Sequence, residues 1–469
     1  MSYETAVASM FALGHELAHT PSNKFDLEHM RVLLNAMDHP ERAFPAVLIA
    51  GTNGKGSTAA TLASILGASR LKTGLYTSPH LIRINERIRV NGEEIRDSDF
   101  ARLHGEVNRV AERLVELAEL PWHPSFFEMM TAMAFVYFAR ERVEIAVLEV
   151  GMGGRLDATN VVEPLVSVIA DISLDHQKFL GNTVREIARE KVGIIRPGGV
   201  VVTLPQQAEA NDVIGNAILD LAARGVSAVQ YVPPVSPGST EYLVPSTGKD
   251  LSNANAAEDR KPPFTCRYPM QVMGKQILVD TPLVGRHQLR NVALAVAAAE
   301  ELTKSGLPGI TPESIEVGIR QTRWPGRFQV LSAQSGWPEI VLDVAHNPAG
   351  AWALRSTLSA AYGEAVPARE ITMVFGVMRD KAVREITEIL LPVAGHVIVT
   401  HANNPRSAGP AEIRQAAARI AAENQIEEAV DVSAALARAR AIAGAGGVVV
   451  ITGSIYIVGE AMRILDVRI

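Results

Sequence analysis

Residues 47–58 constrain the fold of this chain more than any other segment, because they read Val-Leu-Ile-Ala-Gly-Thr-Asn-Gly-Lys-Gly-Ser-Thr. An apolar run ends in a glycine-rich turn, and a helix-forming segment at 59–66 follows it. This order predicts a strand, a phosphate-binding loop and a helix whose first turn faces an anion. Lys55 is suited to reach terminal phosphates, and the Ser57 hydroxyl is suited to ligate Mg²⁺. The alternative is an ordinary glycine-rich turn, because Gly56 separates Lys55 from Ser57 and the usual G-x-x-x-x-G-K-[ST] spacing is not kept.

Composition is that of a globular protein with a sizeable core, at 47% hydrophobic and 20% charged residues. The net charge of −6 argues against general nucleic-acid binding, which favours a basic face. Cys266 is the only cysteine, so no internal disulfide can form and a reducing cytoplasm is expected. The first residues lack the basic start of a signal peptide. The uncharged stretch 441–459 contains glycines, which favour a buried strand, a turn and a helix over a membrane span.

Short apolar runs alternate with helix-like segments along most of the chain, which predicts an α/β fold with doubly wound sheets. The near-continuous apolar character of the runs indicates parallel strands that are covered on both faces. The predicted strands of the first part lie at 46–50, 72–76, 145–150 and 165–169, with helices near 127–140, 183–191 and 291–302. The predicted strands of the second part lie at 340–343, 370–375, 397–400 and 448–452, with helices near 349–361, 382–390 and 411–422.

Two domains account for this order of elements. We expect an N-terminal domain at 1–305, which begins with about 40 helical residues, and a C-terminal domain at 324–469. Glycines and prolines at 304–323 indicate a linker between them. The proline-rich stretch 231–262 breaks the alternation and is predicted as an irregular surface excursion, followed by a β-rich segment at 266–283.

Polar residues follow several predicted strands, at the sheet edge where open α/β sheets bind ligands. Ser78 lies after the second strand, Glu149 inside the end of an apolar strand, and Asp175-His176 beyond a further strand. A carboxylate buried like Glu149 requires a cation or a donor, and a magnesium ion beside a phosphate loop meets that requirement. The alternatives are a solvated loop for Ser78, a buried ion pair for Glu149 and a hydrogen-bonded core residue for His176. Lys191 near a helix end has the alternative of a simple terminal cation.

Two further turns carry chemistry. Gly151, Gly153 and Gly154 permit a tight turn before Arg155 and Asp157, which offer a donor and an acceptor. In the second part, Trp324-Pro325-Gly326-Arg327 forms a turn that presents a guanidinium, a group suited to phosphate. Asp343 and His346 lie between a strand and a helix, where they can contact ribose hydroxyls and phosphate or can act as a helix cap or turn.

Together these motifs resemble the Mur ligase superfamily and, more narrowly, the folylpolyglutamate synthase/dihydrofolate synthase family. The resemblance runs in the same order along nearly the whole chain, and its longest and most specific motif is 149–160. The excursion at 231–262 has no counterpart in it. The matching segments are 51–57, 78–80, 149–160, 175–176, 190–191, 285–288, 325–327, 343–348 and 453–456.

The resemblance implies a doubly wound P-loop-type ATPase domain followed by a smaller Rossmann-like C-terminal domain, with the active site between them. It implies that ATP is held by Asn53, Gly54, Lys55, Gly56, Ser57, Asn291, Arg327, Asp343 and His346. It also implies two magnesium ions held by Ser57, Ser78, Glu149 and His176, and a carbamate on Lys191. The residues with a catalytic role would be Lys55, Lys191, His176 and Glu149. The acceptor substrate would lie near Phe25, Asp26, Leu27, Ser125, Phe126, Phe127, Glu128, Leu156, Asp157 and Ala158.

The activity that this resemblance implies is ATP-dependent amide ligation in folate biosynthesis. The γ-phosphoryl group of ATP would activate the carboxylate of dihydropteroate or a tetrahydrofolate as an acyl phosphate, which the amine of L-glutamate then attacks. The family expectation is a cytoplasmic monomer without nucleic-acid or membrane partners, and the sequence leaves open which of the two acceptors is used.

Two other functions are alternatives to this ligase activity. A peptidoglycan-precursor ligase is disfavoured, because it would carry a substrate domain ahead of the loop and only 50 residues precede Gly51. A non-catalytic nucleotide-binding protein is disfavoured because it would be expected to lose Glu149, His176 or Lys191, all of which are present.

Overall fold

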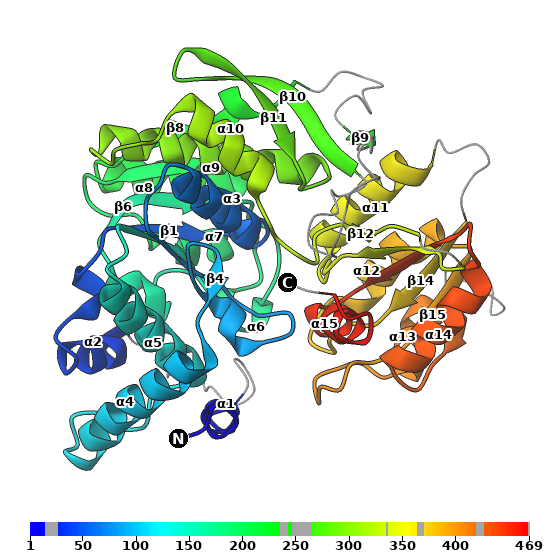
Figure 1. The fold of residues 1–469 in the computed structure, drawn as a ribbon, viewed down its shortest axis with the longest axis horizontal. Helices are drawn as coiled ribbons and strands as arrows, with labels where there is room; N and C mark the ends of the chain where they lie inside the picture. The colour runs from blue at the N-terminus through cyan, green and yellow to red at the C-terminus, as the bar shows by residue number, and fades with distance from the viewer. Residues whose placement is uncertain are drawn as a thin grey trace, which may run out of the picture. The chain divides into compact units, whose positions relative to one another are not determined.

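The computed structural model describes residues 1–14, 27–234, 243–245, 264–333, 336–363, 370–418 and 426–467. Phe25, Asp26 and most of the predicted excursion at 231–262 lie outside these ranges. The chain divides into two compact units. The first comprises Met1–Val232, Met270–Ile277 and Arg290–Gln321, and the second comprises Pro233–Pro269, Leu278–Leu289 and Thr322–Ile469 (Figure 1).

The strands of the first unit form a sheet in the order β4-β3-β2-β5-β1-β6-β7-β8 within the described residues. Strands β2, β5, β1, β6, β7 and β8 run parallel, and β3 and β4 add an antiparallel edge. The strands are β1 (Ala46–Ala50), β2 (Thr73–Tyr76), β3 (Ile88–Val90), β4 (Glu93–Glu94), β5 (Ile145–Glu149), β6 (Pro164–Ile169), β7 (Val200–Thr203) and β8 (Arg224–Ser227).

The helices of this unit cover both faces of the sheet (Figure 1). They are α1 (Tyr3–Ala12), α2 (Leu27–Asn35), α3 (Lys55–Ala68), α4 (Asp97–Glu116), α5 (Phe126–Glu141), α6 (Gln177–Leu180), α7 (Val184–Val192), α8 (Ala208–Asp220), α9 (Arg286–Lys304) and α10 (Pro312–Gln321). Short 3₁₀ turns occur at η2 (Pro40–Arg42), η3 (Ile84–Arg87), η4 (Ala158–Val161) and η5 (Ala228–Tyr231). The doubly wound α/β fold predicted from the sequence is therefore confirmed for this unit.

Strand β1 shows why its sequence is apolar throughout. Ala46, Leu48 and Ala50 pack into a core with helices α1, α2, α4, α5, α7 and α8. Because successive side chains of a strand point to opposite faces, Val47 and Ile49 are buried on the other face, where α3 contacts the sheet. A strand that is buried on both faces ends at the carboxyl edge of the sheet, and the loop after it is the one that the sequence predicts to bind phosphate.

The second unit holds a six-stranded sheet within the described residues, in the order β12-β13-β17-β14-β15-β16. Within this sheet, the edge strand β12 runs antiparallel to β13, and the other neighbouring strands run parallel to one another. Its strands are β12 (Gln329–Leu331), β13 (Glu339–Leu342), β14 (Ile371–Phe375), β15 (His396–Val399), β16 (Ile426–Glu428) and β17 (Val448–Thr452). Its helices are α11 (Pro348–Tyr362), α12 (Val383–Leu390), η6 (Leu391–Val393), α13 (Pro410–Ala417), α14 (Val432–Ala443) and α15 (Ile455–Ile464). A further sheet joins β9 (Leu243–Pro245), β10 (Phe264–Val272) and β11 (Lys275–Thr281).

The range predicted as a linker, 304–323, contains helix α10, which the division into compact units assigns to the first unit. Its Gly306, Pro308 and Gly309 precede the helix, and Pro312 occupies the first helical position, where proline needs no N–H partner. The domain boundaries at 305 and 324 stay a prediction. None of the helices within the described ranges combines the length and the apolar character that a membrane-spanning helix requires.

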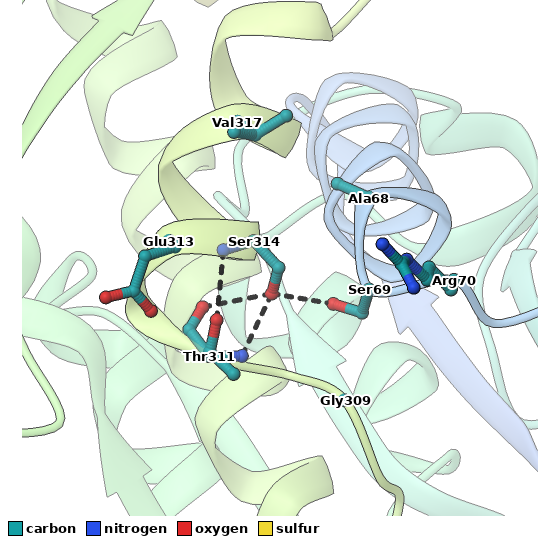
Figure 2. A pocket seen from close by; sticks show the side chains of 8 residues that line it. All are labelled: Ala68, Ser69, Arg70, Gly309, Thr311, Glu313, Ser314 and Val317. Carbon is teal, nitrogen blue, oxygen red and sulfur yellow. Dashed lines mark hydrogen bonds between the residues drawn. The ribbon is translucent and has the colours of Figure 1, made fainter.

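Helix α10 crosses α3 at close range because one of its residues is a glycine. A Cβ atom at Gly318 would lie 2.4 Å from the Cα atom of Ile65. The Ser64 hydroxyl donates to the Gly318 carbonyl at 2.7 Å, and the Ser69 hydroxyl donates to that of Ser314 at 2.8 Å. A pocket of about 420 Å³ lies beside this crossing. Figure 2 shows the residues that line it, among them Ser314, which also bonds to Thr311. Its hydroxyl groups already pair with one another, so we interpret the cavity as part of the helix packing.

We expect Gly318→Ala to lower the stability of the first unit by about 1–3 kcal/mol, because the added methyl group meets backbone atoms of α3. Gly67→Ala in α3 is the matched control. Nothing lies within 4 Å of a Cβ atom there, so the better helix propensity should raise stability by up to about 1 kcal/mol. The denaturant midpoint of the full chain measures both effects. Equal midpoints for the two variants would contradict the close crossing.

Candidate functional site

The phosphate loop, residues 51–54, joins β1 to α3 and is hydrogen-bonded to the segment that follows β6. The backbone N–H groups of Thr52 and Asn53 donate to the Asp171 carbonyl at 2.8 and 3.1 Å. Ser173 reinforces the attachment, because its carbonyl accepts from the Thr52 hydroxyl at 3.0 Å and its own hydroxyl accepts from the Asn53 side-chain amide at 3.1 Å. These hydrogen bonds join the loop at the end of β1 to the segment at the end of β6, the neighbouring strand. Sequence reasoning missed Asp171 and Ser173, whose only signal is their place directly after a strand.

Gly54 at the end of the loop is required by its surroundings. Its φ of +84° lies in the left-handed region that favours glycine, and it caps the N-terminus of α3. A Cβ atom there would lie 2.2 Å from Oδ1 of Asn291 on α9. The structure therefore brings Asn291, a predicted nucleotide residue, onto the loop. Ser57 follows in the first turn of α3 and is buried.

Two lysine side chains end on one carbonyl oxygen of the loop. Lys55 Nζ donates to the Gly51 carbonyl at 3.0 Å and to the Thr52 carbonyl at 3.3 Å. Lys191 Nζ, from the last turn of α7, donates to the same Gly51 carbonyl at 2.8 Å. Lys191 is 3% exposed, so it is not a solvated cation at a helix end.

The electrostatics of Lys191 follow from this placement. Burial away from water holds the pKa of its amine well below the ordinary value, and the nearby Lys55 cation lowers that pKa further. The carboxylates of Asp175 and Asp157 oppose the shift but are smaller causes. The environment of Lys191 therefore shifts its equilibrium toward the neutral amine.

The glycine-rich loop at 151–160 holds the C-terminal end of α7, from which Lys191 projects. A Cβ atom at Gly154 would lie 2.8 Å from the Glu190 carbonyl oxygen, and the Arg155 N–H donates to that carbonyl at 2.8 Å. Gly193 lies equally close to Arg155, since a Cβ atom added to this glycine would lie 2.4 Å from the Arg155 Cβ atom. The Asn160 side chain donates to the Gly193 carbonyl at 3.1 Å. The motif at 149–160 therefore packs against the helix end that carries Lys191, although the two segments are separated in the sequence.

Asp157 holds the same loop together from within. Its carboxylate accepts from the Met152 N–H at 2.9 Å and from the Thr159 N–H and hydroxyl at 3.0 and 2.5 Å. Burial raises the pKa of this carboxyl, against the effect of its hydrogen bonds. Leu156 precedes it and Ala158 begins η4, so all three predicted substrate residues belong to one rigid turn.

The other predicted substrate residues that the structure describes lie at the starts of α2 and α5. Leu27 begins α2, and helices α2 and α5 both contact η4. At the start of α5, Ser125 and Glu128 form a reciprocal cap with bonds of 2.7 and 3.3 Å. Phe126 is buried, and its ring stacks on that of Phe11 with 5.9 Å between the ring centroids. Phe127 packs on Gly151, because a Cβ atom added to this glycine would lie 2.5 Å from the Phe127 Cζ atom.

The candidate metal ligands follow adjacent strands of the sheet. Ser78 follows β2, and its N–H donates at 3.2 Å to the carboxylate of Glu149, the last residue of the neighbouring β5. His176 lies beyond β6 with a φ of +49°, and its N–H donates at 2.8 Å to Asp175, which affects the pKa of Lys191. Because β2, β5, β1 and β6 are consecutive in the sheet, their carboxyl ends bring these residues to the edge that bears Ser57.

This donor set fits Mg²⁺. No three His, Cys, Asp or Glu side chains come together as a metal cage among the described residues. Mg²⁺ usually takes one or two protein oxygens and keeps water and phosphate oxygens for its other positions. Glu149 is a buried carboxylate that accepts from the Ser78 N–H, and Ser57 is buried in the first turn of α3, so these residues offer hard oxygen atoms without a cage.

In the second unit, Asp343 connects the turn that bears Arg327 to the start of α11. Its two carboxylate oxygens accept from the Phe328 N–H at 2.8 Å and from the Ala345 N–H at 2.9 Å. Burial raises the pKa of this carboxyl, and the Arg327 guanidinium opposes the shift. His346 Nδ1 lies 2.9 Å from the Val344 carbonyl oxygen. The structure thus brings Arg327, Asp343 and His346 together at one end of β13, with Asp343 in the turn-holding role that the sequence left open as an alternative.

Comparisons with known proteins agree with this architecture. The Mur ligase middle domain matches residues 49–217, and the glutamate ligase domain of Mur ligases matches residues 326–455. The Bacillus subtilis protein named dihydrofolate synthase/folylpolyglutamate synthase is 33% identical over 442 residues, which cover 93% of this chain and 94% of that protein.

Solved structures lead to the same group. Mycobacterium tuberculosis folylpolyglutamate synthase, complexed with ADP and AMPPCP, has a TM-score of 0.83 at 29% identity and 99% coverage of both chains. Escherichia coli FolC, in complex with DHPP and ADP, has a TM-score of 0.79 at 27% identity, with coverage of 99% of this chain and 98% of that one. The chain therefore belongs to the folylpolyglutamate synthase/dihydrofolate synthase family of the Mur ligases.

Proposed function

We propose that this protein is an ATP-dependent ligase that joins L-glutamate to the carboxylate of a pteroate or folate through an acyl phosphate. The observation that carries the proposal is the meeting of Lys55 and the buried Lys191 at the Gly51 carbonyl of a phosphate loop. The titles of the similar structures name ADP, AMPPCP and DHPP as bound molecules, which supports a nucleotide and a pterin-type acceptor. The chain would act as a monomer in the cytoplasm, without nucleic-acid or membrane partners.

In this proposal the phosphates are bound by the loop of the first unit. The backbone N–H groups of the loop face the phosphates at the N-terminus of α3, and the Lys55 ammonium turns from the loop carbonyls toward the γ-phosphate. Asn291 on α9 and the residues Arg327, Asp343 and His346 are proposed as further nucleotide-binding residues. Asn53, Gly54, Gly56 and Ser57 complete the set.

We propose two Mg²⁺ ions at Ser57, Ser78, Glu149 and His176. The metal, when bound, supplies positive charge that lets an anionic carboxylate approach an anionic phosphate. Glu149 and the two hydroxyls provide hard oxygen atoms at the carboxyl edge of the sheet. Lys55 shares the neutralisation of charge on the group that is transferred.

Lys191 is proposed to carry a carbamate. The neutral amine attacks the carbon of CO₂, a nitrogen–carbon bond forms, and a proton leaves to give an anionic carbamate. The depressed pKa supports this step, because an ammonium has no lone pair for the attack. The modification turns a buried amine at the Gly51 carbonyl into an anionic oxygen group. Glu149 and His176 are the other two residues with a proposed catalytic role.

The acceptor substrate is proposed to lie against η4 and the start of α5. Leu27, Ser125, Phe126, Phe127, Glu128, Leu156, Asp157 and Ala158 would form this region, together with Phe25 and Asp26 outside the described residues. The buried internal bonds of Asp157 and the cap formed by Ser125 and Glu128 fix the shape of this region. Dihydropteroate and tetrahydrofolate both have the required carboxylate, so the acceptor is to be decided by assay.

The direct test is phosphate release from ATP and L-glutamate with dihydropteroate or with tetrahydrofolate, together with the chain length of each product. We expect release that requires both glutamate and one of the acceptors, because the acyl phosphate forms only on a bound carboxylate. Release without an acceptor, or no release with either acceptor, would show that the proposed ligation is wrong.

Replacing Lys55 with alanine should reduce turnover by at least about 100-fold, since the lysine stabilises charge on the transferred phosphoryl group. Lys72→Ala is the matched control. Lys72 pairs with Glu141 at 2.8 Å just before β2, at the opposite end of the strands, so its loss should leave turnover within about twofold. Steady-state rates at saturating ATP check both. Near-normal turnover of Lys55→Ala would remove this residue from the mechanism.

Replacing Lys191 with alanine should abolish turnover, and adding a short carboxylic acid such as acetate should restore part of it. The space left by the side chain can admit an acid whose oxygens replace those of the carbamate. Lys191→Arg is the control, because arginine fills the space and forms no carbamate, so acetate should not restore its activity. Wild-type turnover by Lys191→Ala without acid would contradict the carbamate.

A further inference from the structure

Two charged residues that the proposed chemistry does not use lie against the phosphate loop. Asp171 follows β6, and Arg290 lies in the first turns of α9. Arg290 Nη2 lies 2.6 Å from Asp171 Oδ1, and Nε lies 3.2 Å from each of the two carboxylate oxygens. The guanidinium thus contacts the carboxylate through two nitrogens, an arrangement that fixes orientation as well as distance.

Asp171 holds the loop through its backbone while its side chain holds Arg290. Its carbonyl accepts the N–H groups of Thr52 and Asn53, the two residues that follow Gly51. A change in the position of the Asp171 carboxylate is therefore transmitted to the loop through a single residue. The short side chain of Asp171 joins the ion pair to the carbonyl that accepts from the loop.

Arg290 has a second acceptor and an informative neighbour in the chain. Its Nη2 also donates at 3.0 Å to the Pro205 carbonyl, just beyond β7, so α9 is tied to the ends of two strands. The next residue, Asn291, fills the space above Gly54 where a Cβ atom would be. Because residues 290 and 291 share one helical turn, the bonds of Arg290 fix the rotation of α9 that places Asn291 on the loop.

Stability alone is a weak explanation for this arrangement. The two side chains remain 30% and 34% exposed, and ion pairs with that access to water usually contribute little to the stability of the fold. Placement is different, because misplacing a binding group by about 1 Å can weaken its function by a large factor. The pair is built to control where the loop and Asn291 lie.

We propose that Asp171 and Arg290 are positioning residues for the nucleotide, which set the phosphate loop and Asn291 in their binding arrangement. This role rests on the proposed function, since it assumes that the loop binds ATP. Neither residue needs to touch the nucleotide. Their effect passes through the Asp171 carbonyl on one side and through Asn291 on the other.

The test compares the affinity for AMPPCP, measured by titration calorimetry on the full chain, between wild type and variants. Arg290→Met and Asp171→Asn should each raise the Kd about tenfold, as expected for a misplaced binding group. The double variant should be at most about twofold weaker than the poorer single variant, because both substitutions break the same interaction. The KM for ATP should rise with the Kd, while the KM for L-glutamate stays within about twofold of wild type.

The control is Arg438→Met in the second unit. Arg438 makes a similar two-nitrogen pair with Glu427, at 2.7 and 2.9 Å. Glu427 lies on β16, at the opposite edge of its sheet from β12 and β13. Arg438→Met should leave the Kd unchanged. If Arg290→Met fails to fold, Arg290→Lys takes its place, and the Kd should rise about three- to fivefold because a single ammonium cannot reproduce the two-nitrogen contact with the Asp171 carboxylate.

Three results would overturn the proposal, and they can be told apart. Wild-type protein that binds AMPPCP, with folded Arg290 and Asp171 variants that bind it equally well, would overturn the positioning role alone. Wild-type protein that does not bind AMPPCP would overturn the proposed function and the positioning role with it. Strictly additive effects in the double variant would also contradict the role, because they would mean that the two residues act separately.

Discussion

One carbonyl oxygen, that of Gly51, determines how the first unit is organised around its site. It accepts hydrogen bonds from two lysine amines that come from helices distant in the sequence. Keeping the second amine away from water costs free energy, which the surrounding loops offset by holding α7 in place. The glycine-rich turn at 151–160, the internal bonds of Asp157 and the strand ends beside them all serve this placement. Lys191 is therefore a buried amine and not an exposed cation at a helix end.

Much of the fold could be predicted because it follows from local rules. The strands at 46–50 and 448–452 are found at the predicted residues, since both are apolar runs buried on two faces. The amphipathic helix α4, the edge strands β3 and β4 and the pair β7 and β8 were not predicted. Short or edge strands such as Glu93–Glu94 have little apolar pattern, because only their pairing with neighbours defines them. The glycines before α10 resembled a linker, yet they allow a helix to start.

The candidate site divides in the same way. Lys55, Glu149 and Lys191 could be proposed from motifs, because chemistry constrains their residue types, and their roles stay predictions. Asp171, Ser173 and Arg290 could not, because the bonds they make join segments that are separated by more than a hundred residues in the chain. Asp343 was placed correctly at a strand end, but the sequence did not reveal that both of its oxygens accept backbone N–H groups. A motif identifies a residue type, whereas the fold decides which of its atoms remain available.

Gly154 packs against residues 190–191, and Gly193 packs against Arg155, so neither glycine has room for a side chain. The atoms that a new side chain would meet are a carbonyl oxygen and Cα or Cβ atoms, which cannot rotate aside as the tip of a long side chain can. A change at one position therefore calls for a compensating shift of the opposing segment, which also carries the lysine. During evolution, the two stretches would have to drift together or remain as they are, and a designer who wished to alter the pocket would have to treat them as a single unit.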